Sequence, residues 1–132
     1  MKYKLKKETK PTLATFGRYK AVAVHGQTVD TRQIIQEVSR HEGLSEGTVT
    51  AVMMGLSSAI ARHLRQGDKV RLDSWGLMKL EIESDKVAHA EDFSPRKHLR
   101  GVRLHFLPES AKGKPALYQD IRFEREKDSA PF

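Results

Sequence analysis

The strongest hydrophobic pattern in the chain lies in its middle third and has the period of an amphipathic α-helix. Apolar residues recur there every three or four positions, so that they share one face of a helix. They are Val49, Val52, Met53, Leu56, Ile60 and Leu64. Ser45 stands at the expected N-cap, and Gly67 follows the last turn. The pattern therefore predicts one long helix between these two residues.

A shorter helical pattern precedes the long one. Ile34, Ile35 and Val38 share a face, which predicts a helix over Thr31–Glu42, just before Gly43. Elsewhere, apolar and polar residues alternate, which predicts short strands. The expected strands cover residues 3–7 and 19–24 before the helices, and residues 70–72, 77–82 and 102–106 after them. The sequence thus predicts an α+β fold.

Two stretches between these elements stand out. A short bend, Ser74-Trp75-Gly76, separates two of the strands and holds the only tryptophan of the chain. Residues 84–100 are polar, contain Pro95 and hardly alternate. A connection of that length inside a compact domain usually means function or disorder.

The pattern weakens toward the C-terminus. Residues 110–118 have the composition of a short helix, although Gly113 and Pro115 oppose it. Residues 121–128 can form either a strand or a tail, and the last few residues are expected to be disordered.

Composition limits the classes of protein to which the chain can belong. With 132 residues, of which 38% are hydrophobic, it is one domain with a modest core, so oligomerisation is expected. No apolar run is long enough for a membrane span, and the first residues lack the apolar stretch of a secretion signal. The absence of cysteine excludes disulfides and thiolate metal sites and fits a cytoplasmic protein.

The net charge of +7 is unevenly distributed. Residues 1–20 carry seven lysines and arginines against one acidic residue, and residues 93–114 carry six against one. Residues 21–92 carry eight against eleven. Such asymmetry is expected if part of the surface meets a polyanion, although lysine-rich ends can also serve solubility alone.

Lysines alternate with Tyr3 and Leu5 at the start of the chain. They are Lys2, Lys4 and Lys6, followed by Lys7 and Lys10. On a strand this pattern points several lysines to one face, where they either extend a basic surface or protect an edge strand from aggregation.

No pattern of catalytic residues is present. The six histidines are scattered without metal-ligand spacing, and the chain contains no HExxH, no glycine-rich phosphate loop and no Gly-x-Ser-x-Gly. We therefore expect no enzymatic activity, no cofactor and no small-molecule substrate.

From Leu44 to Ile82 the sequence LSEGTVTAVMMGLSSAIARHLRQGDKVRLDSWGLMKLEI is similar, without a gap, to helix two and the following hairpin of the HU/IHF family of bacterial nucleoid proteins. TRQIIQEVSRHEG resembles helix one of that family with one extra residue, and VRLHF resembles the strand that returns from its DNA-binding arm. The bend reads Ser74-Trp75-Gly76 where the family has Gly-Phe-Gly, and Met78 replaces an aromatic residue. The N-terminal MKYKLKK and RYKAVAVHGQTVDTRQI resemble diverged HU-like domains of Bacteroidetes-type bacteria. Some of these are fused to winged-helix, immunoglobulin-like or glycine-rich partners, whereas only about twenty-five residues follow Phe106 here.

The resemblance implies an intertwined homodimer in which a helix pair packs on an antiparallel sheet. Residues 1–30 would form an N-terminal strand extension packed on an HU-like domain of residues 31–118, with an extended β-arm at about 84–101 and a C-terminal tail at 119–132. The residues implied in the dimer core are Val49, Val52, Met53, Leu56, Ile60, Trp75 and Phe106. An exposed base-stacking role is the alternative for Trp75.

The resemblance also implies that the arms bind duplex DNA, since HU and IHF wrap the minor groove. The implied DNA-binding residues are Lys86, Phe93, Pro95, Arg96, Lys97, His98, Arg100 and Arg103. The family inserts the proline of an Arg-Asn-Pro motif between base pairs; that motif is missing, and Pro95, Phe93 or neither could replace it. The first half of the arm is acidic, through Glu81, Glu83, Asp85, Glu91 and Asp92, and would repel phosphate. A solvated basic loop is the alternative for the segment PRKHLRG.

Two hypotheses follow. The first is a cytoplasmic, homodimeric nucleoid protein that binds duplex DNA with little sequence specificity and bends it, without catalysis. The second is an HU-fold dimer that has lost DNA bending and acts as a protein-interaction or scaffolding module.

Overall fold

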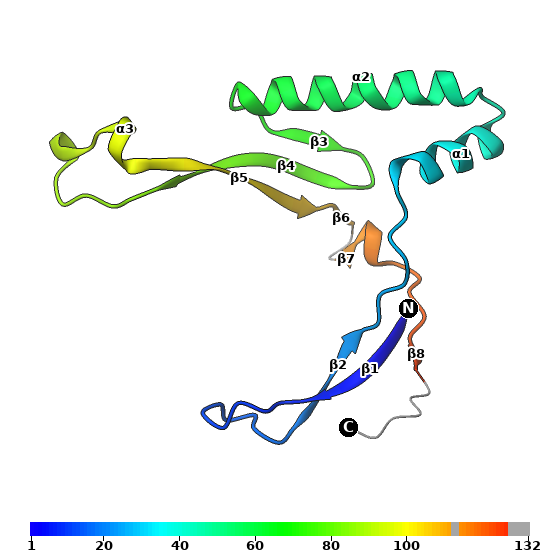
Figure 1. The fold of residues 1–132 in the computed structure, drawn as a ribbon, viewed down its shortest axis with the longest axis horizontal. Helices are drawn as coiled ribbons and strands as arrows, with labels where there is room; N and C mark the ends of the chain where they lie inside the picture. The colour runs from blue at the N-terminus through cyan, green and yellow to red at the C-terminus, as the bar shows by residue number, and fades with distance from the viewer. Residues whose placement is uncertain (112–113, 127–132) are drawn as a thin grey trace. The chain divides into compact units, whose positions relative to one another are not determined.

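The computed structural model describes residues 1–111 and 114–126. The chain divides into two compact units, one formed by Met1–Asp30 with Asp120–Phe132 and the other by Thr31–Gln119. Figure 1 shows the elements of both units. Among the described residues, no helix combines the length and the apolar character that crossing a membrane requires.

The first unit is built on a three-stranded sheet. Strands β1 (Lys2–Lys7) and β2 (Tyr19–Ala23) form an antiparallel hairpin, as the alternation predicts, and β8 (Glu124–Arg125) lies parallel to the other side of β1. Of the two alternatives for the C-terminal segment, a short strand is therefore observed. The last residues, expected to be disordered, lie outside the described part of the chain.

The second unit begins with the two predicted helices, α1 (Thr31–Glu42) and α2 (Glu46–Arg65). The Oγ of Ser45 accepts a hydrogen bond of 3.1 Å from the backbone N–H of Thr48, which satisfies one free donor of the first turn. Both helices and this N-cap confirm the periodicity argument.

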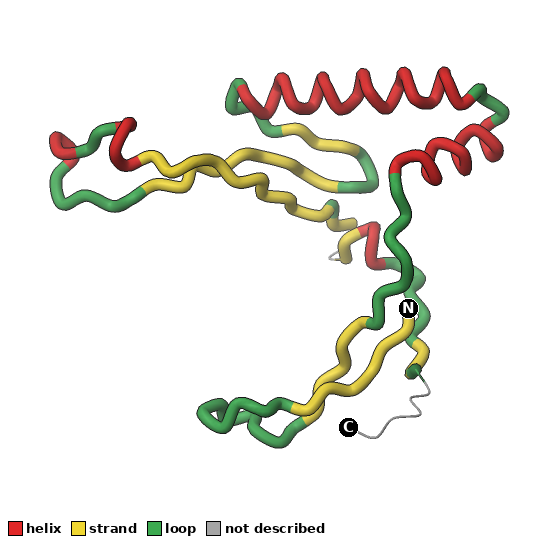
Figure 2. The backbone as a smooth tube through the Cα atoms, in the orientation of Figure 1, coloured by secondary structure: helices red, strands yellow, loops and turns green. Residues whose placement is uncertain are grey.

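The sheet of the second unit has the strand order β3 (Val70–Leu72), β4 (Gly76–Ser84) and β5 (Leu99–Pro108). Strands β4 and β5 pair along their length, with an irregularity at Glu83/Ser84, and form a long two-stranded ribbon that Figure 2 shows in yellow. β5 is longer than the predicted strand of residues 102–106 because its pairing with β4 continues beyond the apolar alternation.

The bend before β4 is held by close backbone packing. A Cβ on Gly76 would lie 2.1 Å from the carbonyl oxygen of Leu107, and Gly76 has a φ of +153°, so only glycine fits there. The N–H of Glu109 donates a 2.8 Å hydrogen bond to the carbonyl of Trp75, and the Glu109 carboxylate accepts one of 2.6 Å from the N–H of Ser74. The indole of Trp75 stays 58% exposed in the single chain.

Residues 85–98 connect β4 and β5 and contain two helical turns, η1 (Ala90–Asp92) and α3 (Pro95–His98). The sequence pattern indicated no regular element there. Pro95 begins α3 because its fixed φ suits the first turn and its missing N–H is not needed there.

The helix expected over residues 110–118 is wrong for most of its length. Strands β6 (Ser110–Ala111) and β7 (Lys114–Pro115) pair with each other, and of the described residues in this stretch η2 (Ala116–Tyr118) alone is helical, as a 3₁₀ turn. Pro115 cannot donate a hydrogen bond inside a helix, which explains why the helical turn starts after it.

The hydrophobic core of the single chain is small. Val49 and Leu64 are the buried apolar residues among those described. The exposed fraction is 62% for Val52, 43% for Leu56 and 39% for Phe106. Part of the helical stripe that the sequence predicts to be buried is thus in contact with solvent.

Candidate functional site

The β4–β5 ribbon has two chemically different faces. Residues directly opposite each other in an antiparallel pair lie on the same face. One face, the polar face, carries Lys79 opposite His105 and Glu81 opposite Arg103. The other face, the apolar face, carries the pairs Met78–Phe106, Leu80–Leu104 and Ile82–Val102.

Glu81 organises the polar face. Its carboxylate accepts hydrogen bonds from Arg103 Nη2 at 3.2 Å and His105 Nδ1 at 2.9 Å, and Lys79 Nζ lies 3.5 Å away. The hydrogen bond from Arg103, followed by the one from His105, holds the pKa of Glu81 below its ordinary value. Glu81 is therefore ionised at neutral pH and keeps three basic side chains gathered around one carboxylate.

A second ion pair lies where the ribbon ends. Arg100 Nε and Asp85 Oδ1 are 2.6 Å apart, and the Asp85 N–H donates to the carbonyl of His98 at 2.8 Å. The N–H of Ser94 donates to Nδ1 of His98 at 2.9 Å, and the rings of Phe93 and His98 stack with centroids 5.5 Å apart. These contacts fix the conformation of residues 85–98, which we name the tip.

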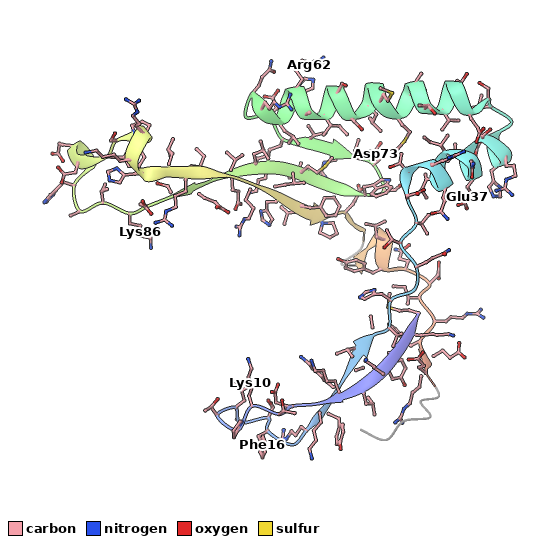
Figure 3. All side chains as sticks on the ribbon, viewed as in Figure 1. Lys10, Phe16, Glu37, Arg62, Asp73 and Lys86 are labelled. Atoms are coloured by element: carbon pink, nitrogen blue, oxygen red, sulfur yellow. The ribbon has the colours of Figure 1, made fainter. Side chains whose placement is uncertain are left out.

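The tip exposes basic side chains. Arg96 and Lys97 project from α3, and Lys86 follows the end of β4, where Figure 3 labels it. Arg100 and Arg103 keep 72% and 66% of their side chains exposed although both are in ion pairs. An anion can therefore reach all five of these cations.

The structure separates the predicted DNA-binding residues into three groups. Arg96, Lys97 and His98 lie on α3, Lys86 lies at the start of the tip with Arg100 just beyond its end, and Arg103 lies farther along the ribbon on the polar face. Of the two wedge candidates, Pro95 is exposed at the start of α3, whereas Phe93 stacks on His98 and is 37% exposed.

The acidic residues of the arm fall into two groups, those in ion pairs and those exposed to solvent. Glu81 and Asp85 are neutralised by arginines of β5, whereas Glu83, Glu91 and Asp92 are exposed. The repulsion expected from five free carboxylates is accordingly smaller than their number indicates.

Sequence reasoning missed two basic residues of the polar face, Lys79 and His105. The alternation of Lys79 with Leu80, and of His105 with Leu104 and Phe106, could have revealed them, but their cross-strand partners depend on the register of β5. Among the residues that the structure describes, no group of three or more histidine, cysteine, aspartate or glutamate side chains could hold a metal ion.

The residues implied in a dimer core differ in burial. Val49 is buried, Met53 and Ile60 are half-buried, and the others, Val52, Leu56, Trp75 and Phe106, are exposed in the single chain. Between α1 and α2 an open groove of about 380 Å³ is lined by Thr31, Ile35, Thr50, Met53, Met54, Ser57 and Ser58.

Comparison with known proteins identified a family and a similar solved structure. The model of a family described as "HU domain fused to wHTH, Ig, or Glycine-rich motif" matches residues 1–125. A crystal structure at 2.25 Å resolution, of a protein described as a "Putative bacterial DNA binding protein" from Bacteroides vulgatus ATCC 8482, has a similar fold, with a TM-score of 0.60 at 14% sequence identity. The match covers 94% of this chain and 47% of that one, so the chain spans about half the length of its structural relative. No curated protein matches the chain.

Proposed function

Because the chain belongs to the family of HU domains fused to winged-helix, immunoglobulin-like or glycine-rich motifs, we propose that it is a homodimeric, architectural DNA-binding protein. It binds duplex DNA through the β4–β5 ribbon and its tip, with little sequence preference, and bends it as part of the bacterial nucleoid. The observation that carries this proposal is the exposed set of cations on the tip and the polar face, in a chain of this family.

The proposed contacts are with the phosphate backbone. Arg96, Lys97 and Lys86 present their charges on a connection that projects at the end of two paired strands. Cations that neutralise phosphates release condensed counterions, which gives affinity without reading the bases. Pro95 is the proposed wedge, because it is exposed at the start of α3 while Phe93 is occupied by its contact with His98.

The proposed dimer rests on the incomplete core. Val52, Leu56 and Trp75 are at least 43% exposed, and the apolar face of the ribbon exposes Ile82 and Val102 by more than 60% each. Soluble monomers rarely expose large apolar patches to water. A second copy of the chain would cover the same residues on both protomers, as a two-fold axis requires.

A scaffolding module is the second candidate function, and one observation favours it. Arg100 and Arg103 already pair with carboxylates of their own chain, so a phosphate must compete with Asp85 and Glu81 for them. If phosphate cannot displace these carboxylates, the dimer still forms but its affinity for DNA is negligible.

Salt dependence of binding separates the two functions. Fluorescence anisotropy with a labelled linear duplex, and with the same duplex pre-bent, should show affinity that falls steeply between low and moderate salt. Replacing Arg96, Lys97 and Arg100 by alanine should reduce the steepness of the slope of log K against log salt by up to about 2.7, at about 0.9 for each phosphate contact.

A matched variant controls for net charge. Replacing Arg32, Arg40 and Arg62 by alanine removes the same number of exposed cations from α1 and α2 and should leave the slope unchanged. Equal slopes for the tip variant and the wild type would remove the tip from the interface. Absence of duplex binding even at low salt would refute DNA binding and favour the scaffold.

A further inference from the structure

The β1–β2 hairpin of the first unit carries lysines on one face. Lys2, Lys4 and Lys6 alternate along β1, and Lys20 of β2 stands directly opposite Lys6. These four residues are called the lysine face. Alternate residues of a strand are about 6.6 Å apart, a spacing similar to that between neighbouring phosphates of a nucleic-acid strand.

At one end of the lysine face, Glu124 of β8 stands beside Lys2 in the register of the sheet, whereas at the other end Lys6 and Lys20 face each other. Like charges directly opposite each other destabilise a strand pair, and Lys6 and Lys20 form such a pair. None of the four lysines makes an ion pair with another of the described residues. Glu8, the acidic residue of the hairpin, accepts a 3.0 Å hydrogen bond from the N–H of Lys10 in its own loop. An external anion would therefore relieve a repulsion that the fold leaves in place.

The loop of the hairpin is ordered and presents apolar side chains. The N–H of Glu8 donates to the carbonyl of Arg18 at 2.8 Å, and successive turns place the N–H of Phe16 3.0 Å from the carbonyl of Leu13. Leu13 is 44% exposed and Phe16 is 56% exposed. Figure 3 labels Lys10 and Phe16 in this loop, at the end of the hairpin.

We propose that the β1–β2 hairpin is a second DNA-binding ribbon, with its lysine face on the phosphates of duplex DNA and Phe16 and Leu13 in contact with the bases. This goes beyond the proposed function, because it places a further contact in the other unit and on other residues. Phenylalanine and leucine are among the side chains that DNA-binding proteins insert between base steps. The hairpin thus combines a line of cations with an apolar end.

A long polyanion fits this arrangement better than a membrane surface does. Lys2 lies about 13 Å along the strand from Lys6, and farther from the loop. If Phe16 inserted into a flat bilayer, these lysines would lie away from its surface, whereas a nucleic-acid backbone can run along the strand and contact them. The geometry therefore points to DNA.

The double variant Lys6→Gln/Lys20→Gln tests the proposal. It should reduce the steepness of the slope of log K against log salt on duplex DNA by about 1.8, at about 0.9 for each of two phosphates. Its thermal midpoint should be equal to or above that of the wild type, because the substitution removes like charges that face each other. Weaker DNA binding together with unchanged or higher stability excludes a folding defect as the cause.

Two further variants sharpen the experiment. Arg32→Gln/Arg40→Gln removes the same charge from exposed positions of α1 and should leave the slope unchanged. Phe16→Ser should weaken binding by about fivefold or more without changing the slope, since it removes a base contact and no charge.

The outcomes distinguish the two proposals. If the slope is less steep for the hairpin variant and unchanged for the tip variant, the hairpin contact with DNA is supported and the tip contact is refuted. The reverse result overturns the hairpin contact and leaves the proposed function intact. Equal losses from the hairpin variant and its α1 control, or binding to vesicles with phosphatidylserine but not to DNA, would also overturn it.

Discussion

Val52 offers a direct test of the proposed dimer, because its side chain is 62% exposed in the single chain and belongs to the helical stripe of α2. Val52→Thr keeps the shape and the branched Cβ, so the fold of one chain should tolerate it. In a dimer that covers this position, the new hydroxyl is removed from water. The substitution therefore separates burial against a partner from burial within the chain.

The expected cost follows from desolvation of the hydroxyl. Burying a hydroxyl without a full set of partners costs about 1–3 kcal/mol. A threonine in a helix can donate to a carbonyl one turn earlier, which brings the cost to the lower end, about 1 kcal/mol. Two-fold symmetry doubles it to about 2 kcal/mol, which raises the dimer dissociation constant about 30-fold.

Sedimentation equilibrium over a range of protein concentrations measures this constant. Val29→Thr makes the same chemical change at a residue that is 50% exposed in the first unit, and should leave the dissociation constant within about threefold of the wild type. A wild-type chain that is folded and monomeric at micromolar concentration would refute the reasoning. So would a Val52→Thr variant that dimerises as tightly as the wild type.

Two further predictions concern the ribbon. Gly76→Ala should lower the free energy of unfolding, measured in urea titrations, by at least about 3 kcal/mol. The added Cβ would clash with the Leu107 carbonyl, and the backbone conformation alone costs a non-glycine residue about 1–3 kcal/mol. A loss below about 1 kcal/mol would contradict the packing described. Glu81→Gln should flatten the fall in stability below pH 4.5. The hydrogen bonds from Arg103 and His105 depress the pKa of Glu81 in the folded state. Their contribution to stability is therefore complete above that pH and is lost as the carboxylate becomes protonated. Unfolding measured between pH 3 and 7 tests this, and identical acid limbs in variant and wild type would count against the network. The same variant should also tighten DNA binding, since it frees Arg103 for phosphate.

Local structure was largely predictable from the sequence, because it depends on short-range periodicity. The stripe from Val49 to Leu64 and the cap at Ser45 determine α2 without any knowledge of its neighbours. The same holds for the hairpin strands, where alternation marks β1 and β2. Residues 110–118 were misjudged because their helical composition was given more weight than Gly113 and Pro115, which oppose a helix interior.

The basic residues of the tip were predicted from the resemblance to the DNA-binding arm, but their environment was not. From the sequence, Glu81 is expected to repel phosphate. In the structure it lies at the centre of a cluster of basic side chains, because it accepts a hydrogen bond from Arg103, 22 residues away. Asp85 and Arg100 meet only because the strands pair in one register. No sequence pattern predicts which carboxylate is neutralised, since that depends on distances across the ribbon.

By itself the sequence determined the helices, most of the strands, the excess of positive charge and the presence of an apolar stripe along the second helix. Only the tertiary structure decided which part of that stripe stays exposed, which charges cancel and which remain for a partner. The physical reason is that periodicity acts between neighbours along the chain. Burial and electrostatic pairing act between residues that only the folded backbone brings within a few ångströms of each other.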